Sequence, residues 1–581
     1  MAKVTINGIE VEAEEGTTIL DAARLAQVDI PTLCKHEDLP ATAACGVCVV
    51  KVVGRKGMVR ACTTPVTDGM EVITQDPELV DVRRTVVKLI LSNHPNTCLT
   101  CGRNGTCELQ ALAADFAIRR ETFPNVTPDI PRDSSTGAIE LEPTKCIKCG
   151  RCVMVCQENQ DVWALSFLNR GIETRISPAG DIDLGESPCI RCGQCSAHCP
   201  TGAIFEYSQT EQVWDLLMDP EVHCIAQIAP AVRVTIGEAF GYDPGTNLTS
   251  KLYAALRRLG FQTVFDTNFG ADVTIMEEAT EFVQRIRKGT GPLPLITTCC
   301  PSWVDFMEKF HEDMIPYFSS CKSPHAILGT LTKTYYAEKV GLDRDKICMI
   351  SIMPCTSKKY EIQRSADMYA SGEQDVDIAI TTRELTRMIQ QAGLEFANLP
   401  AEKADNPLGE YSGAGTIFGT TGGVMEAALR SAYYFLHGRE LEDVDLKQVH
   451  GLEGVKEAAV EFDGKEYRLA VAHGLANVEY VLNNIRAAAE KEGEPAYHLV
   501  EVMACPGGCI GGGGQSWGIT DEIRQKRSDG LHGDDLARTI RRSHQNPAVK
   551  QLYEESIGEP LSEKAHELLH TSYQPKPEYR R

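Results

Sequence analysis

Hydrophobic and polar residues alternate along much of the chain, and the period of the alternation differs from region to region. Residues 3–13 alternate in steps of two around Asn7 and Gly8, a pair that favours a tight turn, so they predict a β-hairpin. Thr17 is expected to cap a helix that runs to Ala26. Residues 78–93 show a helical period instead. The N-terminal part therefore predicts a small sheet followed by a longer helix.

From about residue 210, short apolar runs alternate with helical patterns, which predicts βαβ units and parallel sheets. The expected strands are 224–229, 264–266, 295–298, 347–353, 376–381, 468–473 and 498–504. The expected helices are 249–260 (with Thr249 as N-cap), 271–288, 382–393 and 421–436. After residue 520 the chain turns polar and helical. The last residues, 570–581, are expected to form a tail that is mobile or contacts a partner, with a frayed end.

Charge and cysteine content narrow the class of protein. The formal net charge of the 581 residues is −23, which disfavours nucleic acid and anionic membranes as main partners. No apolar run reaches the ~18 residues of a membrane span, and the start lacks the apolar core of a signal peptide. We therefore expect a cytoplasmic protein, in which most of the 23 cysteines bind metal or act in catalysis rather than form disulfides.

Four early cysteines, Cys34, Cys45, Cys48 and Cys62, lie among small residues that let the backbone approach sulfur closely. Four thiolates in this order fit a [2Fe–2S] cluster. A zinc site and scattered core cysteines are the alternatives. The hairpin and helix that precede these residues fit a ferredoxin-like β-grasp fold, which favours the cluster.

A second group follows the helix at 78–93. It consists of His94, Cys98, Cys101 and Cys107, which could hold either a zinc ion or a [4Fe–4S] cluster. A lone histidine is more often structural than a ligand, but this one lies four residues before a C-x2-C pair. Histidine ligation would raise the potential of a cluster, as it does in Rieske centres.

The third group is a duplicated run in which each copy has the spacing C-x2-C-x2-C-x3-C. The first copy is Cys146, Cys149, Cys152 and Cys156. The second copy is Cys189, Cys192, Cys195 and Cys199. This spacing is typical of bacterial two-cluster ferredoxins, in which the fourth cysteine of each run binds the cluster of the other run. We therefore expect one [4Fe–4S] cluster on Cys146, Cys149, Cys152 and Cys199, and a second on Cys156, Cys189, Cys192 and Cys195.

Three further stretches, 297–303, 353–359 and 501–509, lie at the ends of expected strands, where ligands of α/β proteins bind. They supply four thiolates, Cys300, Cys355, Cys505 and Cys509, enough for another [4Fe–4S] cluster. A fifth thiol, Cys299, is left over beside the first of them.

These three stretches, together with the order of the upstream sites, closely resemble the signatures of [FeFe]-hydrogenases from about residue 1 to 570. In that family a [4Fe–4S] cluster joins a two-iron subsite that carries CO, CN⁻ and azadithiolate, forming the H-cluster. The resemblance implies that Cys300, Cys355, Cys505 and Cys509 bind the cluster, and that Cys509 also bridges to the two-iron subsite.

The implied architecture is multidomain, α+β and α/β. Residues 1–78 would form a β-grasp [2Fe–2S] domain and residues 79–140 a His/Cys3 [4Fe–4S] domain. A ferredoxin domain with two [4Fe–4S] clusters would follow at 141–209. The α/β H-cluster domain would span 210–520, with a helical segment and tail at 521–581.

The resemblance also assigns a proton relay from Cys299 through Glu278, Ser319 and Glu281, with Arg285 near its exit. Glu278, Glu281 and Arg285 share one face of a helix, a pattern that by itself more often marks a solvated charged stripe. Lys358 would donate to a cyanide ligand. The other residues implied to line the site are Ala229, Pro230, Ser323, Met353 and Met503.

Two positions depart from the family pattern. Ala231 stands where a serine is frequent, and His325 stands where glutamine is common. Neither change removes a ligand or a relay residue. Three remaining thiols, Cys224, Cys321 and Cys348, are expected to be buried and structural.

The resemblance implies reversible oxidation of H₂, with electrons passing through iron–sulfur clusters to ferredoxin or to an NAD(P)H-linked flavoprotein. A bifurcating complex with a small [2Fe–2S] subunit is the rival to a chain that works with ferredoxin alone, and maturases would install the two-iron subsite. No Gly-x-Gly-x-x-Gly opens a βαβ unit, so no dinucleotide site is evident. Two alternatives are a non-catalytic electron-transfer subunit, which residues 1–205 alone would fit, and a sensory or assembly homologue. The latter usually lacks the thiol at 299 and the relay carboxylates.

Overall fold

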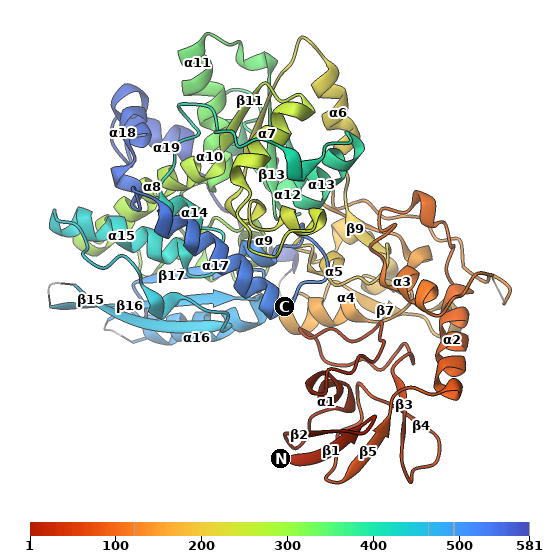
Figure 1. The fold of residues 1–581 in the computed structure, drawn as a ribbon. Coiled ribbons are helices and arrows are strands. Elements are labelled where there is room, and N and C mark those ends of the chain that lie inside the picture. Colours follow the sequence, from red (N-terminus) through yellow and green to blue (C-terminus); the bar gives the residue numbers. More distant parts are fainter. Residues whose placement is uncertain (121–122, 463, 492–493, 580–581) are drawn as a thin grey trace.

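The computed structural model describes residues 1–120, 123–462, 464–491 and 494–579, and the chain starts with a small mixed sheet (Figure 1). β1 (Ala2–Ile6) and β2 (Ile9–Ala13) pair antiparallel around Asn7 and Gly8, which both have positive φ. The predicted hairpin is therefore confirmed. The strand order is β2-β1-β5-β3-β4, with β3 (Val49–Val52), β4 (Met58–Arg60) and β5 (Met70–Ile73).

The first helix, α1 (Ile19–Leu25), begins one residue later than predicted. Its cap is Thr18, whose side chain accepts a hydrogen bond from the Asp21 amide, so Thr17 as the cap was wrong. The helix buries Ile19, Leu20 and two alanines against the sheet. α2 (Pro77–Leu91), capped by Asp76, confirms the helix predicted at 78–93 and leads away from the sheet.

Short elements carry the middle of the chain. They are α3 (Glu108–Asp115), α4 (Arg151–Met154), α5 (Gln194–Ala197), and the pairs β6 (Ile139–Leu141) with β9 (Ile204–Glu206) and β7 (Ser166–Leu168) with β8 (Arg175–Ser177). β6 precedes the duplicated cysteine run and β9 follows it, and the two strands pair antiparallel. This pairing closes both copies of the run into one unit.

Two larger sheets form the C-terminal part. The first has the order β11-β10-β13-β14, with β10 (His223–Ile228), β11 (Thr263–Asp266), β13 (Ile347–Met353) and β14 (Ile378–Thr381). Every pair in it is parallel, as predicted. The second has the order β12-β17-β16-β15, with β12 (Leu295–Ile296), β15 (Val455–Phe462), β16 (Lys465–His473) and β17 (Leu499–Met503). Its β15–β16 hairpin is antiparallel, and β15 was not predicted.

Helices cover both sheets. They are α6 (Thr210–Met218), α7 (Thr249–Leu259), α8 (Thr267–Lys288), α9 (Pro301–Phe310), α10 (Pro324–Leu331), α11 (Ala337–Val340), α12 (Lys358–Glu361), α13 (Thr382–Gln391), α14 (Gly413–Ile417), α15 (Gly423–His437) and α16 (Leu475–Ala489). The segment after residue 520 adds α17 (Asp521–Ala537), α18 (Pro547–Leu552) and α19 (Glu563–Leu569). Within the described residues, no helix has both the length and the apolar composition needed to cross a membrane.

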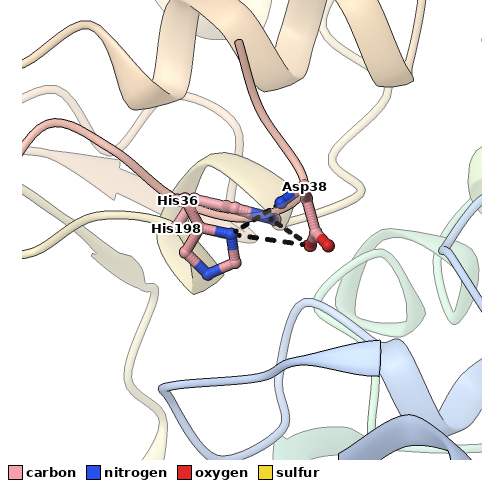
Figure 2. Close-up of side chains that lie close together, drawn as sticks. All are labelled: His36, Asp38 and His198. Carbon is pink, nitrogen blue, oxygen red and sulfur yellow. Dashed lines mark hydrogen bonds and ion pairs between the residues drawn. The ribbon is translucent and has the colours of Figure 1, made fainter. Parts of the chain in front are cut away.

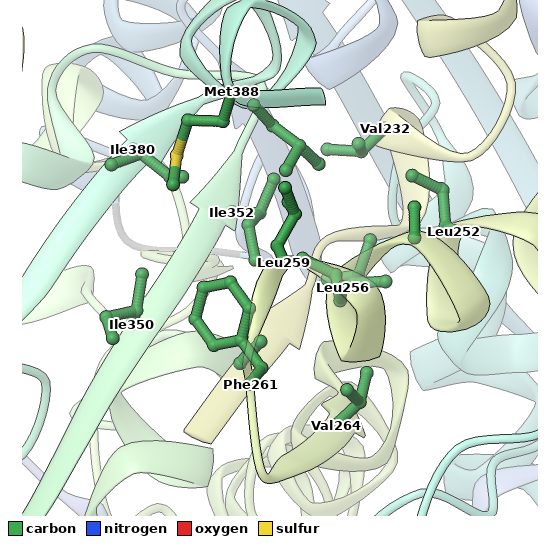
Figure 3. Close-up of a cluster of buried hydrophobic side chains, with 14 of the residues drawn as sticks. Val232, Leu252, Leu256, Leu259, Phe261, Val264, Ile350, Ile352, Ile380 and Met388 are labelled. Carbon is green, nitrogen blue, oxygen red and sulfur yellow. The ribbon is translucent and has the colours of Figure 1, made fainter. Parts of the chain in front are cut away.

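The core beside the first sheet shows why the apolar runs fold as strands (Figure 3). All seven residues of β13 are buried, as expected for a parallel strand covered on both faces. Leu252, Leu256 and Leu259 of α7 pack in the same core. Leu256→Ala would therefore cost about 3 kcal/mol of stability. Thr249 was wrongly predicted as the cap of α7: it is the first helical residue and its side chain makes no capping bond.

A buried ion-pair junction ties three distant segments together, and its His36, Asp38 and His198 side chains are shown in Figure 2. Asp38, from the N-terminal part, contacts His198 Nε2 at 3.0 Å and Arg524 Nη1 of α17 at 2.9 Å. Burial alone would raise the pKa of Asp38, but hydrogen bonds from His198 and Arg524 hold it well below its usual range. Burial lowers the pKa of the adjacent His36 to about 3. Because Arg524 already neutralises the carboxylate, this cluster is a structural junction rather than a cation site.

The tail contradicts the prediction of a mobile end over most of its length. Lys576 lies 2.6 Å from Asp305 and 2.9 Å from Glu308, both of α9. Thr571 accepts a hydrogen bond from Arg364 at 2.8 Å. The fraying predicted for the last residues concerns 580–581, which lie outside the described part of the chain.

Candidate active site

Strand ends from both large sheets converge on one enclosed pocket. β13 leads through Met353 into Cys355, and β17 leads through Met503 into Cys505. β12 leads into the cysteine pair before α9, and β10 leads into Ala229 and Pro230. The residues lining the pocket include Ala229, Pro230, Cys299, Cys300, His325, Met353, Cys355, Lys358, Met503, Cys505, Gly508 and Cys509. The structure thus brings together cysteines that are up to 210 residues apart in sequence (509 − 299 = 210).

The donor set of this pocket fits an iron–sulfur group. Burial raises the pKa of Cys355 to about 12 and that of Cys505 well above its usual range, with the neighbouring cysteines adding to the shift. Several thiolates can coexist in an apolar enclosure only beside a cationic centre, and iron ions provide one. Backbone N–H groups of Ala504 and Trp303 point at the Cys300 sulfur. The hydroxyl groups of Ser302 and Ser323 are buried without a partner among the described residues, so they remain free to donate to a bound group.

Lys358 is held at the pocket by a carboxylate that the sequence did not reveal. Its Nζ lies 2.6 Å from Glu361 Oε2 and 3.1 Å from the Cys299 carbonyl oxygen. His325 Nε2 lies 2.6 Å from the same Glu361 oxygen. Burial alone would raise the pKa of Glu361, but Lys358 and His325 hold it at about 2. Burial lowers the pKa of His325. The unusual histidine therefore acts as a hydrogen-bonding partner of Glu361, and the two residues together orient Lys358.

The other departure and the spare thiols are not among the residues that line the pocket. Ala231 is fully buried and packs with Ile510 and Leu531. Cys224 and Cys348 are cross-strand neighbours on β10 and β13, and their side chains contact each other. Cys321 is buried near Glu278 and Glu277. All three thiols are buried, as expected.

The predicted relay residues lie near one another, and hydrogen bonds among the described residues join Ser319, Glu281 and Arg285. Glu278, Glu281 and Arg285 lie on α8, and the Ser319 hydroxyl contacts Glu281 Oε2 at 3.3 Å. Arg285 Nη2 lies 2.6 Å from Glu281 Oε1. Exposure to solvent increases from Glu278, which is 2% exposed, to the Glu281 side chain, which is 14% exposed.

Glu278 has the protonation behaviour that a relay needs. Burial raises its pKa to about 8, although the nearby Ser319 hydroxyl acts in the opposite direction. Neither of its carboxylate oxygens has a well-formed hydrogen bond among the described residues. Burial also raises the pKa of Cys299 well above its usual range. Both groups can therefore carry a proton near neutral pH.

In the N-terminal cysteine region (residues 1–209), three sets of sulfurs come together. Cys34, Cys45, Cys48 and Cys62 lie in mutual contact. One cavity is lined by Cys146, Cys149, Cys152 and Cys199, and another by Cys156, Cys189, Cys192 and Cys195. The members of each set thus meet as the duplicated run leads one to expect.

The fourth predicted group combines a buried histidine with more open cysteines. His94 Nδ1 accepts a hydrogen bond from the Asn96 amide at 3.2 Å, so Nε2 is the ring nitrogen that could bind a metal. Cys98, Cys101 and Cys107 are all partly exposed.

The unit formed by the duplicated run packs directly on the pocket. Thr356 donates to the Arg191 carbonyl oxygen at 2.7 Å, and Gln194 donates to that of Gly511 at 2.9 Å. A Cβ on Gly513 would lie 2.3 Å from the Cys192 carbonyl oxygen, so only glycine permits this approach. Cys192 is close enough to Cys505 to raise its pKa. Electrons leaving the pocket therefore have a short path into this unit.

Fold and site together define a redox enzyme, in which a buried pocket of thiols lies next to cysteine-rich domains that fit iron–sulfur clusters. Family models match in the same order. A 2Fe-2S iron-sulfur cluster binding domain matches residues 1–77, an NADH-ubiquinone oxidoreductase-G iron-sulfur binding region 83–122, and a 4Fe-4S dicluster domain 145–203. The C-terminal domain of the iron only hydrogenase large subunit matches 222–513, and the iron hydrogenase small subunit matches 521–576. The chain belongs to the [FeFe]-hydrogenase family and is a hydrogenase catalytic subunit.

Two relatives that match over nearly their whole length support the same family assignment. The chain is 45% identical to the NADP-reducing hydrogenase subunit HndD of Solidesulfovibrio fructosivorans, over 99% of both chains. It is 41% identical to iron hydrogenase 1 of Clostridium pasteurianum, over 99% of this chain and all of the other. A solved structure of an apo variant of [FeFe]-hydrogenase HydA1 from Chlamydomonas reinhardtii matches with TM-score 0.56 and 42% identity, over 63% of this chain and 99% of the other.

Proposed function

We propose that the pocket holds an H-cluster, a [4Fe–4S] cluster with a two-iron subsite that carries CO, CN⁻ and azadithiolate. Cys300, Cys355, Cys505 and Cys509 would hold it. When bound, this group supplies the iron at which the H–H bond is cleaved or formed. The observation that carries the proposal is the single apolar pocket that gathers all four thiols beside Cys299 and a charged Lys358. Lys358 would donate to a cyanide ligand of this group. Ser323, next to the lining residue Pro324, has a buried hydroxyl without a partner among the described residues and would be a second donor.

The chain's own residues then move the proton. Cys299 exchanges it with Glu278, which is protonated below about pH 8 and passes it to the Ser319 hydroxyl. The Cys321 amide donates to Ser319 Oγ at 3.2 Å and so occupies one acceptor position of the hydroxyl. The hydroxyl hydrogen is then available for Glu281, 3.3 Å away. Glu281, paired with Arg285, delivers the proton to solvent.

The electrons leave through the N-terminal cysteine region. We assign one [2Fe–2S] cluster to a β-grasp domain, residues 1–78, and one His-ligated [4Fe–4S] cluster to residues 79–140. Two further [4Fe–4S] clusters belong to residues 141–209, next to the catalytic domain at 210–520 and the C-terminal segment at 521–581. The contacts of Gln194 and Gly513 support the duplicated-run unit as the first step outward.

The electron acceptor is an NAD(P)-linked partner. The name of the 45% identical relative includes both NADP reduction and the word subunit. Because no dinucleotide fingerprint opens a βαβ unit here, the nucleotide binds to a separate flavoprotein, with a small [2Fe–2S] subunit as a further component. Ferredoxin is the second acceptor, maturases install the two-iron subsite, and the enzyme works in the cytoplasm. A non-catalytic electron carrier would not need Cys299 or the relay carboxylates.

Anaerobic assays under H₂ test this scheme. The matured chain alone should reduce a viologen dye and ferredoxin, and it should reduce NADP⁺ only after the flavoprotein partner is added. NADP⁺ reduction by the chain alone would contradict the assignment of the nucleotide site to another subunit. Failure to reduce any acceptor, with the full complement of iron present, would contradict the H-cluster assignment.

A further inference from the structure

The relay serine belongs to a short loop, residues 318–322, whose two edges are held by different parts of the chain. On one side, the Ser319 amide donates to the Ile296 carbonyl oxygen of β12 at 2.9 Å. On the other side, residues 569–571, which begin at the last residue of α19, run antiparallel to the loop, with Cys321 and His570 as bridge partners. The Lys322 amide donates to the Leu569 carbonyl oxygen at 2.8 Å, and the Thr571 amide donates to the Ser320 carbonyl oxygen at 2.7 Å.

Tyr573 reaches further, to Ser319 itself. Its hydroxyl donates to the Ser319 carbonyl oxygen at 2.9 Å, and the same oxygen accepts from Thr298 at 3.1 Å. The tyrosine ring packs edge-on against Phe318, with centroids 5.0 Å apart, and Arg364 lies over it. The ring is thus fixed on both sides, and its hydroxyl position is determined.

The same C-terminal segment also forms hydrogen bonds to α8, the helix that carries Glu278 and Glu281. His570 Nε2 lies 3.1 Å from the buried Glu277, next to Glu278, while its Nδ1 lies 2.8 Å from the Ser320 hydroxyl. One histidine therefore links the helix that carries Glu278 and Glu281 to the loop that carries Ser319. The backbone of Leu561 adds a hydrogen bond to Glu277 at 2.8 Å.

We propose that Tyr573 and His570 are positioning residues for proton transfer, which set the distance between the Ser319 hydroxyl and the carboxylates of α8. This inference rests on the relay proposed above. They touch neither the pocket nor the transferred proton, so they act only through Ser319 and α8. The region that matches the small-subunit model thereby completes the proton path of the large-subunit domain.

The distance between Ser319 and Glu281 explains why their positions matter. The Ser319–Glu281 distance of 3.3 Å is already at the long end for a hydroxyl–carboxylate hydrogen bond, so a small displacement interrupts it. Without the tyrosine hydroxyl, Thr298 alone holds the Ser319 carbonyl oxygen, and the loop can shift away from α8. Misplacements of this kind reduce rates by amounts that greatly exceed the lost bond.

Tyr573→Phe in the full-length matured enzyme tests the proposal, because it removes only the hydroxyl. We expect turnover in both directions to fall about tenfold and its solvent hydrogen isotope effect to rise, while iron content and the infrared bands of the metal-bound CO and CN⁻ stay unchanged. The matched control is Tyr579→Phe, in the same tail, whose hydroxyl lies 3.4 Å from the Glu186 carbonyl oxygen; it should behave as wild type.

A second readout needs no two-iron subsite. In protein made without maturases, Tyr573→Phe should speed hydrogen exchange at the Cys321 and Lys322 amides relative to Tyr579→Phe. Wild-type turnover with a wild-type isotope effect in Tyr573→Phe would overturn the proposal. So would a loss of activity accompanied by shifted infrared bands or lost iron, since that outcome shows general structural damage.

Ser319→Ala separates this proposal from the one on which it rests. If Ser319→Ala loses turnover and Tyr573→Phe does not, the relay stands and the positioning role is wrong. If Ser319→Ala keeps turnover, the relay assignment itself is wrong, and the positioning role falls with it.

Discussion

The N-terminal cysteine region and the catalytic pocket differ in how the fold brings their cysteines together. In the N-terminal region, each set of cysteines comes from one short stretch of sequence or from the two copies of the duplicated run. Small sheets lie next to these loops. In the catalytic pocket, the ligands arrive on the ends of strands from two sheets, and the pocket exists only when both sheets are in place. Local spacing therefore specifies the first region, whereas the long-range fold specifies the second. A substitution in the pocket should therefore affect catalysis itself. A substitution in an outlying site should affect only electron transfer between the pocket and the acceptor.

The largest effect is expected for Cys299→Ser in the pocket. A hydroxyl keeps the shape but is a much weaker acid than the thiol, so turnover should fall by about 10³-fold. Iron content and the infrared bands should persist, because Cys299 is not a ligand. Cys224→Ala, which removes a buried thiol on β10 outside the pocket, is the control and should retain turnover. Wild-type turnover in Cys299→Ser would refute the relay.

Cys192→Ser should have the next largest effect, because the loop of Cys192 packs against Gly513 beside the pocket. Loss of the cluster there interrupts the first step outward. Turnover should fall on the order of tenfold or more, at least 1.4 kcal/mol in the barrier, with viologen, ferredoxin and the flavoprotein alike. Unchanged turnover with any of these acceptors would show that electrons bypass this unit.

Cys98→Ser sharpens the contrast between the two regions. Its site is local and open, so the variant should lose iron from that site alone and keep dye-linked turnover within about twofold, or about 0.4 kcal/mol. Iron analysis and a viologen assay measure both quantities. If this substitution also abolishes the infrared bands of the pocket, the two regions are not independent.

Glu278→Gln should also change how the stability of the fold depends on pH. The folded-state pKa of Glu278 is raised to about 8 from an ordinary value of 4.5, so its contribution to stability is fully present below pH 4.5 and is lost as the pH rises through 8. Glutamine does not titrate. In urea unfolding of the unmatured protein, the variant should gain on wild type by up to roughly 1.4 kcal/mol per pH unit across that window. Parallel stability curves would contradict the buried, protonated state of Glu278.

The difference between the regions also explains what the sequence could predict. The hairpin at Asn7 and Gly8 and the strand at 347–353 follow from local pattern, and the structure has both. The choice of Thr18 over Thr17 as a cap depends on tertiary contacts, since the Ile19 amide bonds to Thr64 far along the chain. Strand β15 contains paired alanines, which favour a helix and obscure its alternation.

The site residues also differ in whether a local sequence pattern reveals them. The cysteines could be found because their spacing is itself a signal. Glu361 could not, because its partner His325 lies 36 residues away on another helix. Tyr573 is still more remote from its acceptor, Ser319, at a separation of 254 residues. Such contacts carry no local pattern, and only the folded chain shows them.

An infrared spectrum of the anaerobic, matured protein tests the central claim most directly, because few other groups absorb where metal-bound CO and CN⁻ do. If the pocket holds the H-cluster, bands should be present in that window and should shift when H₂ is admitted. An empty window in protein with its full complement of iron–sulfur clusters would contradict the account and leave the four pocket cysteines with a [4Fe–4S] cluster alone.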